Sequence, residues 1–360
     1  MKNNILTYIL LFMIILTFDS ITFAIDQDNY PKGHLEGKVT EVYDQNDKYI
    51  FSTSKGITPG DKYISQENIE YIIKKIKNNK AIAEKRGEIK LLSESKEVID
   101  AFNFAAKKSK TIALYHTHNS ESYQPGAENI EGPGDIHEIG RTLKNQLEKH
   151  GIHVIHSENM HLPHDGAAYE RSRATAIEIA GKRPDAIFDL HRDAIPRREE
   201  YLTRLNGKTI SQIRIVVGRQ NPNYKANDQF ARTLKAVSDD LYPGLIRDIF
   251  YGGGSYNQQV SSHSLLLEFG SHVTGKNKAK TSTEMMASTV NQLLYGQSQE
   301  LAKSSEKREK TYTLTTLVWV LTLFIIALFV YLYIDEGNLS GVIKRVKNYF
   351  HREIIDRGNK

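Results

Sequence analysis

The chain of 360 residues contains no cysteine. This absence excludes disulfide bonds, thiolate metal sites and a cysteine nucleophile, so a zinc site has to be built from histidine, aspartate and glutamate. The sequence also lacks a serine in a nucleophile elbow and the full signature of a phosphate-binding loop. The chain therefore carries no mark of serine-nucleophile catalysis or of nucleotide binding.

Basic residues are in small excess over acidic residues. The formal net charge is +5 and 25% of the residues are charged, so the balance discriminates little between partners in a chain of this length. Basic residues do not alternate with aromatic residues in the runs that track single-stranded nucleic acid. We therefore expect no nucleic-acid partner.

Long hydrophobic runs occur near the two ends. Residues 5–25 follow Lys2 and end near Ala24, as in a secretory signal. Thr22 is a weak substitute for the small residue expected before a cleavage site. Residues 1–25 are therefore predicted to be either a cleaved signal peptide or an N-terminal anchor.

The second run, residues 314–334, carries no charge and is long enough to span a bilayer core. A buried core helix is the alternative, but nothing after this run is large enough to bury it. Residues 335–360 are basic, which predicts a cytoplasmic tail. Basic residues between 303 and 310 oppose this orientation, and the exporting N-terminus decides it. We expect a cell-membrane protein with an extracytoplasmic catalytic domain and a linker at 301–313.

Residues 26–109 show no catalytic pattern and are predicted to form a small accessory or stalk region. Alternation at period two over Glu36–Val42 predicts a strand. Isoleucines at positions 69, 72, 73 and 76 form a helical stripe. Gln66–Lys80 is therefore predicted to be a charged helix.

Between residues 110 and 300, short apolar runs alternate with amphipathic segments. This rhythm predicts an α/β fold in which a mostly parallel sheet is flanked by helices. Asn206-Gly207 favours the tight turn of a hairpin within Leu202–Val217. The other predicted elements are strands from Thr111 to about His118, Ile152–Ile155, Ile187–Leu190 and Leu265–Phe269, and helices Asp135–His150, Ala167–Ala180, Asn227–Leu241 and Thr283–Tyr295.

Three of these strands end in residues that bind metals or transfer protons. The residues at the strand ends are His116 and His118, His191, and Glu268. Ligands of open α/β folds gather at the carboxyl ends of the strands, so we expect one pocket. A His-x-His pair alone is weak evidence for a metal, but three clusters at three strand ends favour a metallohydrolase.

A catalytic zinc ion takes three protein ligands and keeps one position for water. The predicted ligands are His191, one or both of His116 and His118, and one carboxylate. Glu121 follows the histidine pair by three residues. Glu138 is the reserve, although its place at a helix start is explained equally well by the helix dipole.

Glu268 is the predicted general base, which takes a proton from water and passes it to the leaving amine. Arg192 and Asp193 are predicted to orient the histidine or to hold a substrate carboxylate. Both belong to the catalytic set that the sequence favours.

Two other segments are predicted to reach the substrate. The glycine-rich segment 251–258 follows no nucleotide fingerprint and is predicted to be a flexible rim loop, with Tyr256 and Asn257 as substrate contacts. His161 and His164 flank a proline in a loop and are weaker candidates for the same role.

The motifs resemble the stage II sporulation protein P family. They are Tyr115–Ser122, Phe188–Asp193, Tyr256-Asn257-Gln258 and Leu266–Gly270. The resemblance covers roughly residues 111–295 and implies a zinc-dependent peptidoglycan hydrolase with a fold similar to the N-acetylmuramoyl-L-alanine amidases. Such an enzyme cuts the amide between muramic acid and the stem peptide, with endopeptidase action on cross-links, during engulfment of the forespore.

The resemblance also implies partners and roles. The partners are a lytic transglycosylase and a membrane scaffold protein. His191 matches the histidine of the His-Arg-Asp motif and Glu268 matches the catalytic glutamate. The amidase pattern favours His118 as a ligand, while strand geometry leaves His116 open. The C-terminal hydrophobic run departs from the N-terminal anchor usual in the family, which leaves the mode of anchoring and the role of the scaffold open.

The predicted function is zinc-dependent cleavage of the N-acetylmuramic acid–L-alanine amide in cell-wall remodelling during sporulation. One alternative is a cell-surface peptidase or deacetylase that uses the same site, and the reaction products distinguish the two. The other alternative is an inactive domain that binds peptidoglycan and recruits or activates another hydrolase. Metal content tests that alternative, because a binding module has no need of a filled metal site.

Overall fold

The computed structural model describes residues 39–91, 110–296, 319, 321–326 and 328–356. The chain divides into two compact units, Met1–Tyr295 and Gly296–Lys360. The predicted signal or anchor at 1–25 and the predicted linker at 301–313 lie outside the described residues.

The first unit is built on an 11-stranded sheet with the order β2-β1-β5-β4-β3-β12-β11-β13-β8-β6-β7. The strands of the N-terminal part are β1 (Thr40–Tyr43), β2 (Tyr49–Thr53), β3 (Lys62–Ile64), β4 (Ile69–Lys77) and β5 (Lys80–Glu88). The other strands of this sheet are β6 (Thr111–Tyr115), β7 (His153–His156), β8 (Ala186–Asp193), β11 (Ile213–Gly218), β12 (Ile246–Gly252) and β13 (Ser264–Ser271).

The main helices are α3 (Ile136–Lys149), α4 (Ala168–Gly181), α5 (Tyr224–Leu241) and α6 (Lys276–Tyr295). All four were predicted, and the mixed α/β class is confirmed. The sheet is not mostly parallel as predicted, because β11 pairs antiparallel with β13 and β3 pairs antiparallel with β4 and β12. The predicted hairpin also forms, from β9 (Leu202–Leu205) and β10 (Lys208–Ser211), with Asn206 and Gly207 both at positive φ. Such φ values at both central residues are what a tight hairpin turn requires.

The predicted helix Gln66–Lys80 is wrong. The segment contains β4, which pairs antiparallel with β5 across a turn at residues 78–79. Asn78 adopts a φ of 54°, the conformation that asparagine tolerates in a hairpin turn. The isoleucine stripe fits a helix, but β-branched residues pack well on a sheet, and the partner strand decided between the two.

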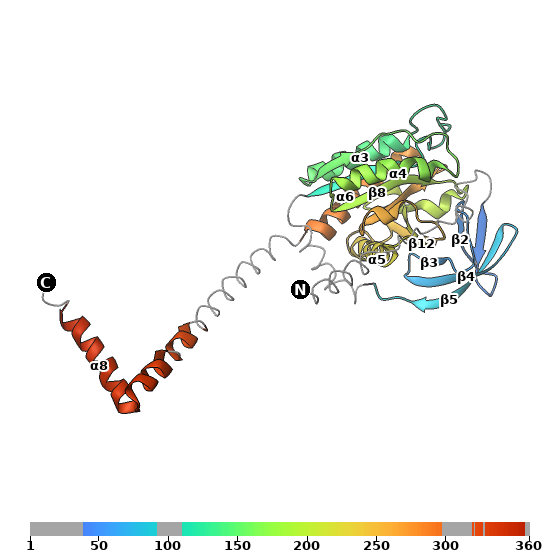
Figure 1. The fold of residues 1–360 in the computed structure, drawn as a ribbon. Coiled ribbons are helices and arrows are strands. Elements are labelled where there is room, and N and C mark those ends of the chain that lie inside the picture. The colour runs from blue at the N-terminus through green and yellow to red at the C-terminus, as the bar shows by residue number, and fades with distance from the viewer. Residues whose placement is uncertain (1–38, 92–109, 297–318, 320, 327, 357–360) are drawn as a thin grey trace, which may run out of the picture. The chain divides into compact units, whose positions relative to one another are not determined.

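The region predicted to be accessory joins the main sheet. β3 pairs antiparallel with β12 through Ile64↔Ile249 and Tyr63↔Phe250 (Figure 1). β12 was not predicted, because Arg247 and Asp248 interrupt its apolar run. Both are buried in the structure. The N-terminal strands therefore extend the sheet that carries the predicted site.

Strand side chains alternate between two faces of the sheet. On β8, Phe188 and Leu190 belong to the largest apolar core, together with buried residues of α3, α5 and α6. Ile187, out of phase with them, packs with Ala176 and Ile179 of α4. One face is therefore covered by α3, α5 and α6, and part of the other by α4.

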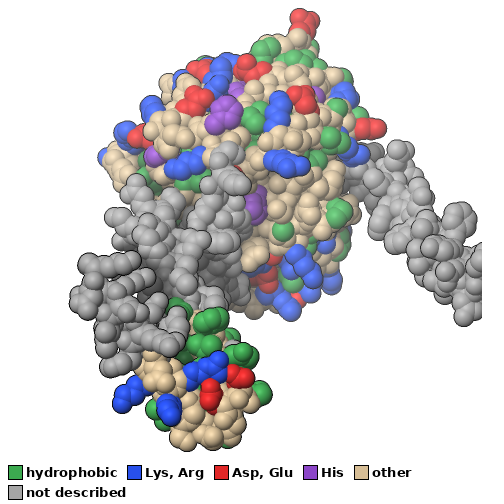
Figure 2. All heavy atoms as spheres, turned by 60° about the vertical axis from the view of Figure 1, so that its left-hand side comes forward, with side chains coloured by type: hydrophobic (Ala, Val, Ile, Leu, Met, Phe, Trp, Pro, Cys, Tyr) green, Lys and Arg blue, Asp and Glu red, His purple; other side chains and the backbone are tan. Residues whose placement is uncertain are grey.

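The small charge excess forms no large patch on the face of the described residues seen in Figure 2, where basic and acidic side chains are interspersed. This distribution gives no support for a nucleic-acid footprint on that face.

The second unit contains a helical stretch, Leu321–Glu336, and α8 (Leu339–Asp356). Most of the large apolar side chains described there are exposed, Trp319 to 67%, whereas Val342 is buried. Among the described residues no single helix is long and apolar enough to cross a membrane. Taken together, the two helices have the length and apolar composition of a membrane span, with a bend of 111° between them. Membrane association is suggested by this pair only, and the transmembrane helix at 314–334 stays a prediction.

Candidate metal centre

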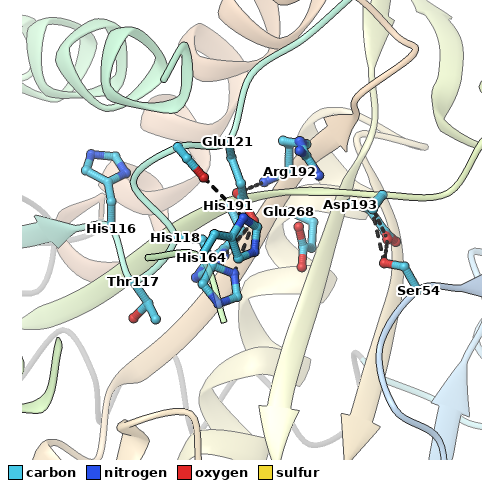
Figure 3. Close-up of polar contacts among 12 residues, drawn as sticks. Ser54, His116, Thr117, His118, Glu121, His164, His191, Arg192, Asp193 and Glu268 are labelled. Carbon is cyan, nitrogen blue, oxygen red and sulfur yellow. Dashed lines mark hydrogen bonds and ion pairs between the residues drawn. The ribbon is translucent and has the colours of Figure 1, made fainter. Parts of the chain in front are cut away.

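His118, Glu121 and His191 form a buried group whose donor atoms all lie within 4.8 Å of one another. Glu121 Oε1 is 3.2 Å from His118 Nδ1 and 3.3 Å from His191 Nδ1 (Figure 3). The three side chains come from the loop after β6 and from β8, two strands that pair in parallel. The group lies where the carboxyl ends of these strands meet, as the sequence predicted.

The end of β6 decides which histidine of the His-x-His pair joins the group. β6 stops at Tyr115, so the two histidines do not share a strand face. His118 turns toward Glu121 and His191, whereas His116 points away from them (Figure 3). A backbone bond fixes the carboxylate, because Arg192 N donates to Glu121 Oε2 over 2.8 Å.

Asp189 connects the two segments that carry the group. Its Oδ1 lies 3.1 Å from His191 Nε2 and accepts a hydrogen bond of 2.9 Å from Thr117 N. Its Oδ2 accepts a 2.7 Å bond from the Thr117 hydroxyl. Carboxylates that contact the second nitrogen of a histidine ligand fix its tautomer and orientation. Asp189 is therefore the residue that orients His191, a role the sequence analysis gave to Arg192 and Asp193.

The electrostatics of the group suit a cation. Burial lowers the pKa of His118 to about 3, although Glu121 opposes the shift. Burial alone would lower the pKa of His191 too, but Asp189 and Glu121 outweigh it and raise that pKa to about 10. Burial disfavours the ionised form of Glu121, yet His191 and His118 hold its pKa well below the usual range. The pocket thus attracts positive charge, and in the absence of a metal a proton on His191 supplies it.

A divalent metal fits this donor set. Two imidazoles and one carboxylate are a ligand set of catalytic zinc sites. Metal binding requires an ionised carboxylate, and metal displaces protons from its histidine ligands. Glu121 meets the first condition, and the proton on His191 is held by the same two carboxylates that a metal cation would neutralise.

Glu268 lies beside this group on the neighbouring strand. β13 pairs in parallel with β8, and Glu268 stands opposite His191 (Figure 3). Its carboxylate is fully buried and forms an ion pair with Lys55, with Nζ 2.7 Å from Oε1. Burial raises the pKa of Glu268, and Lys55 opposes the shift.

His116 belongs to a second cluster, formed by His116, His137 and His156 between β6, β7 and α3. His116 Nε2 lies 2.8 Å from His156 Nε2, and the rings of His116 and His137 are 4.4 Å apart. A Cβ on Gly140 of α3 would come within 2.6 Å of His116. His116 is thus packed on the opposite side of β6 from Glu121.

The reserve ligand Glu138 also lies elsewhere. It forms ion pairs of 2.8 Å with Lys276 and 2.6 Å with Lys280 of α6. Hydrogen bonds from these two lysines lower its pKa to about 2. Glu138 therefore connects α3 to α6, and Glu121 is the carboxylate that the structure brings to the histidines.

Arg192 and Asp193 are buried, and their side chains contact partners other than the two histidine rings. The Arg192 guanidinium pairs with Glu128 and donates to Ser122 O over 3.1 Å. Asp193 accepts from Ser54 Oγ at 2.7 Å and pairs with Arg214 at 2.8 Å. These contacts fix the segments around the site.

The predicted substrate contacts are buried as well. Asn257 is 1% exposed, and its amide donates to Tyr169 O and Ser172 Oγ. Tyr256 is 7% exposed and packs edge-on against Tyr169. The glycine-rich segment is thus packed into the protein instead of forming an open rim, and both substrate roles stay predictions.

Comparison with known proteins decides the family. The model of the family described as stage II sporulation protein P matches residues 30–291, more than half of the chain. The chain belongs to the stage II sporulation protein P family. It is 26% identical over 222 residues to stage II sporulation protein P of Bacillus subtilis strain 168, across 56% of this chain and 55% of the relative. The chain thus spans about half the length of that curated relative. Membership of this family implies a role in sporulation.

Two residues of the site escaped the sequence analysis of this family member. Asp189 had a detectable signal, because it stands two residues before His191 and so shares its strand face. Lys55 had none, since it precedes Glu268 by more than 200 residues in a region without catalytic motifs. Tertiary contacts bring that region to the site, among them the pairing of β3 with β12 and the hydrogen bond from Ser54 to Asp193.

Proposed function

We propose that this protein is a metal-dependent peptidoglycan hydrolase that acts on the cell wall during sporulation. One observation carries the proposal: His118, Glu121 and His191 converge in a buried group at the carboxyl ends of adjacent strands. Glu268 stands opposite His191 on the next strand. Family membership supplies the biological setting.

Each residue has a role that its contacts support. His118, Glu121 and His191 would hold a divalent ion, with zinc as the favoured metal. When bound, such a metal supplies Lewis-acid chemistry, which polarises a carbonyl and lowers the pKa of water. Glu268 acts as the general base that removes a proton from the attacking water and delivers it to the leaving amine. Asp189 keeps the His191 ring in the orientation that a ligand needs.

The finer specificity follows from the resemblance stated above. The bond cleaved is the amide between N-acetylmuramic acid and L-alanine, and cross-link endopeptidase action accompanies it. The catalytic unit faces the extracytoplasmic side of the cell membrane. A lytic transglycosylase and a membrane scaffold protein are the proposed partners.

The test is digestion of purified peptidoglycan by the full chain in detergent, with mass spectrometry of the released fragments. The proposal expects intact stem peptides that begin with alanine, that disappear with a chelator and return with zinc. Release of other fragments would point to a peptidase or deacetylase. A folded chain that binds peptidoglycan, but neither binds zinc nor cleaves peptidoglycan, would favour the inactive domain that recruits another hydrolase.

A further inference from the structure

Lys55 brings a positive charge from the N-terminal strands to the candidate centre. Its side chain is 4% exposed, and its ammonium contacts the fully buried carboxylate of Glu268 at 2.7 Å. The same ammonium lies 5.7 Å from the ring centroid of Tyr256. A buried lysine is rare unless it is paired, so this contact needs an explanation.

The segment that carries Lys55 is fixed by hydrogen bonds at Ser52 and at Ser54. Ser52 N donates to Glu200 Oε2 over 3.1 Å, and Ser52 O accepts a 3.2 Å bond from Arg214 Nη2. Ser54 Oγ donates to Asp193 Oδ1 over 2.7 Å. The chain that presents the ammonium is therefore held by residues of β8, β11 and the loop after β8, which suits a site requiring fixed geometry.

We infer that Lys55 is a positioning residue of the active site, which holds the Glu268 carboxylate in place for proton transfer. The inference rests on the proposed function and deepens it. The N-terminal strands then complete the active site in addition to extending the sheet. Asp193 acquires an indirect role, because it fixes Ser54 next to Lys55.

Charge in the pocket supports this role. Glu268 shares a buried region with the carboxylates of Glu121 and Asp193, and each is close enough to Glu268 to influence its ionisation. Without Lys55 the carboxylate of Glu268 would be a buried charge that has lost its ion-pair partner, which is strongly unfavourable. The side chain would then move or take up a proton, and either change removes a well-placed base. A misplacement of about 1 Å is enough to cost on the order of 100-fold in rate.

The chain offers a matched control. Lys235 on α5 is also fully buried and pairs with a carboxylate, Asp239, at 2.6 Å. It touches none of the candidate ligands, and its other contact is Gln66 O at 3.1 Å. Lys235→Met therefore removes a buried ammonium of the same kind outside the site.

The experiment measures kcat, KM, zinc content and thermal unfolding of the full chain in detergent, with a soluble muramyl peptide as substrate. We expect Lys55→Met to lower kcat about 100-fold with KM and zinc content unchanged. Lys55→Arg keeps the charge and should recover part of kcat. Lys235→Met should lower the unfolding temperature without lowering kcat.

The outcomes separate this inference from the function on which it rests. An active wild type with wild-type kcat in Lys55→Met, or with a raised kcat, overturns the role of Lys55 alone. A wild type that binds zinc but cleaves nothing overturns the proposed function and the role of Lys55 with it. If Lys55→Met does not fold, the double variant Lys55→Met/Glu268→Gln is tested next. Folding restored in the double variant supports the role of the Lys55–Glu268 ion pair, and continued failure to fold overturns that role.

Discussion

The two histidines of the His-x-His motif lie in two contrasting environments. His118 faces Glu121 and stands near His191, whereas His116 faces two other histidines, His137 and His156. Burial lowers the pKa of both His118 and His116, so both are neutral at neutral pH. The first cluster has the buried carboxylates of Glu121 and Asp189 in contact with its imidazoles, whereas the second has only the exposed Glu158, 3.8 Å from His137. The difference shows that anionic neighbours, more than the number of histidines, mark the candidate metal centre.

The sharpest way to break this comparison is to remove one histidine from each cluster. His118→Ala should lose bound zinc and all turnover, because a direct ligand is gone. His116→Ala should keep one zinc per chain. Metal analysis of both purified variants measures this, and equal zinc loss in the two would contradict the assignment.

The general base is the second difference between the two clusters, because the carboxylate of Glu268, which is not a predicted ligand, stands beside the first cluster. Glu268→Gln should keep the metal and lower kcat by roughly 10²–10⁴-fold, the usual contribution of general acid–base catalysis. Fragment release from peptidoglycan and zinc content are measured together. Normal turnover in this variant would remove Glu268 from the mechanism.

Acid should affect the second cluster through folding stability. Burial lowers the pKa of His156 from 6.5 to about 4. As the pH falls, His156 therefore takes up a proton in the unfolded chain before it does so in the folded chain. The folding stability contributed by neutral His156 is present above about pH 6.5 and is lost progressively toward pH 4. The loss is up to about 3 kcal/mol.

Urea unfolding at pH 7 and pH 5 tests this expectation. His156→Gln should lose less stability than the wild type over this interval, because a non-titrating amide replaces the imidazole. His153→Gln is the control, since His153 is an exposed residue of the same strand, β7. Equal pH dependence in the wild type and His156→Gln would refute the prediction.

Asp189 gives the prediction with the smallest expected effect on the first cluster. Asp189→Asn keeps the shape of the side chain but removes the charge next to His191, so zinc affinity should fall about 10–100-fold. Competition with a chromophoric chelator gives the dissociation constant. Asp185→Asn is a suitable control, because Asp185 pairs with Tyr295 and not with a candidate ligand.

Much of the fold was predictable from the sequence because its signals are local. Short apolar runs located the strands β6, β8 and β13, the period of 3.6 located the four main helices, and Asn206-Gly207 located the hairpin. β4 was mistaken for a helix because its isoleucines follow the helical period, and the contact that decides against a helix, with β5, is tertiary. β12 was missed because its buried Asp248 is stabilised by Arg214, 34 residues earlier in the chain.

The candidate site was predictable in part for the same reason. His191 and Glu268 lie near the carboxyl ends of β8 and β13, Glu121 follows β6, and their residue types indicate metal chemistry. The choice between His116 and His118 depended on where β6 stops, which no residue pattern fixes to a single position. Lys55 was beyond prediction, since only the assembled sheet brings it to Glu268.

The most direct test of the central claim is a zinc titration of the metal-free full chain, followed by zinc-edge X-ray absorption of the complex. We predict one zinc per chain, bound by nitrogen and oxygen atoms that include two imidazoles, and no zinc binding in Glu121→Ala. A chain that binds no zinc, or that binds it equally well in Glu121→Ala, would contradict the account.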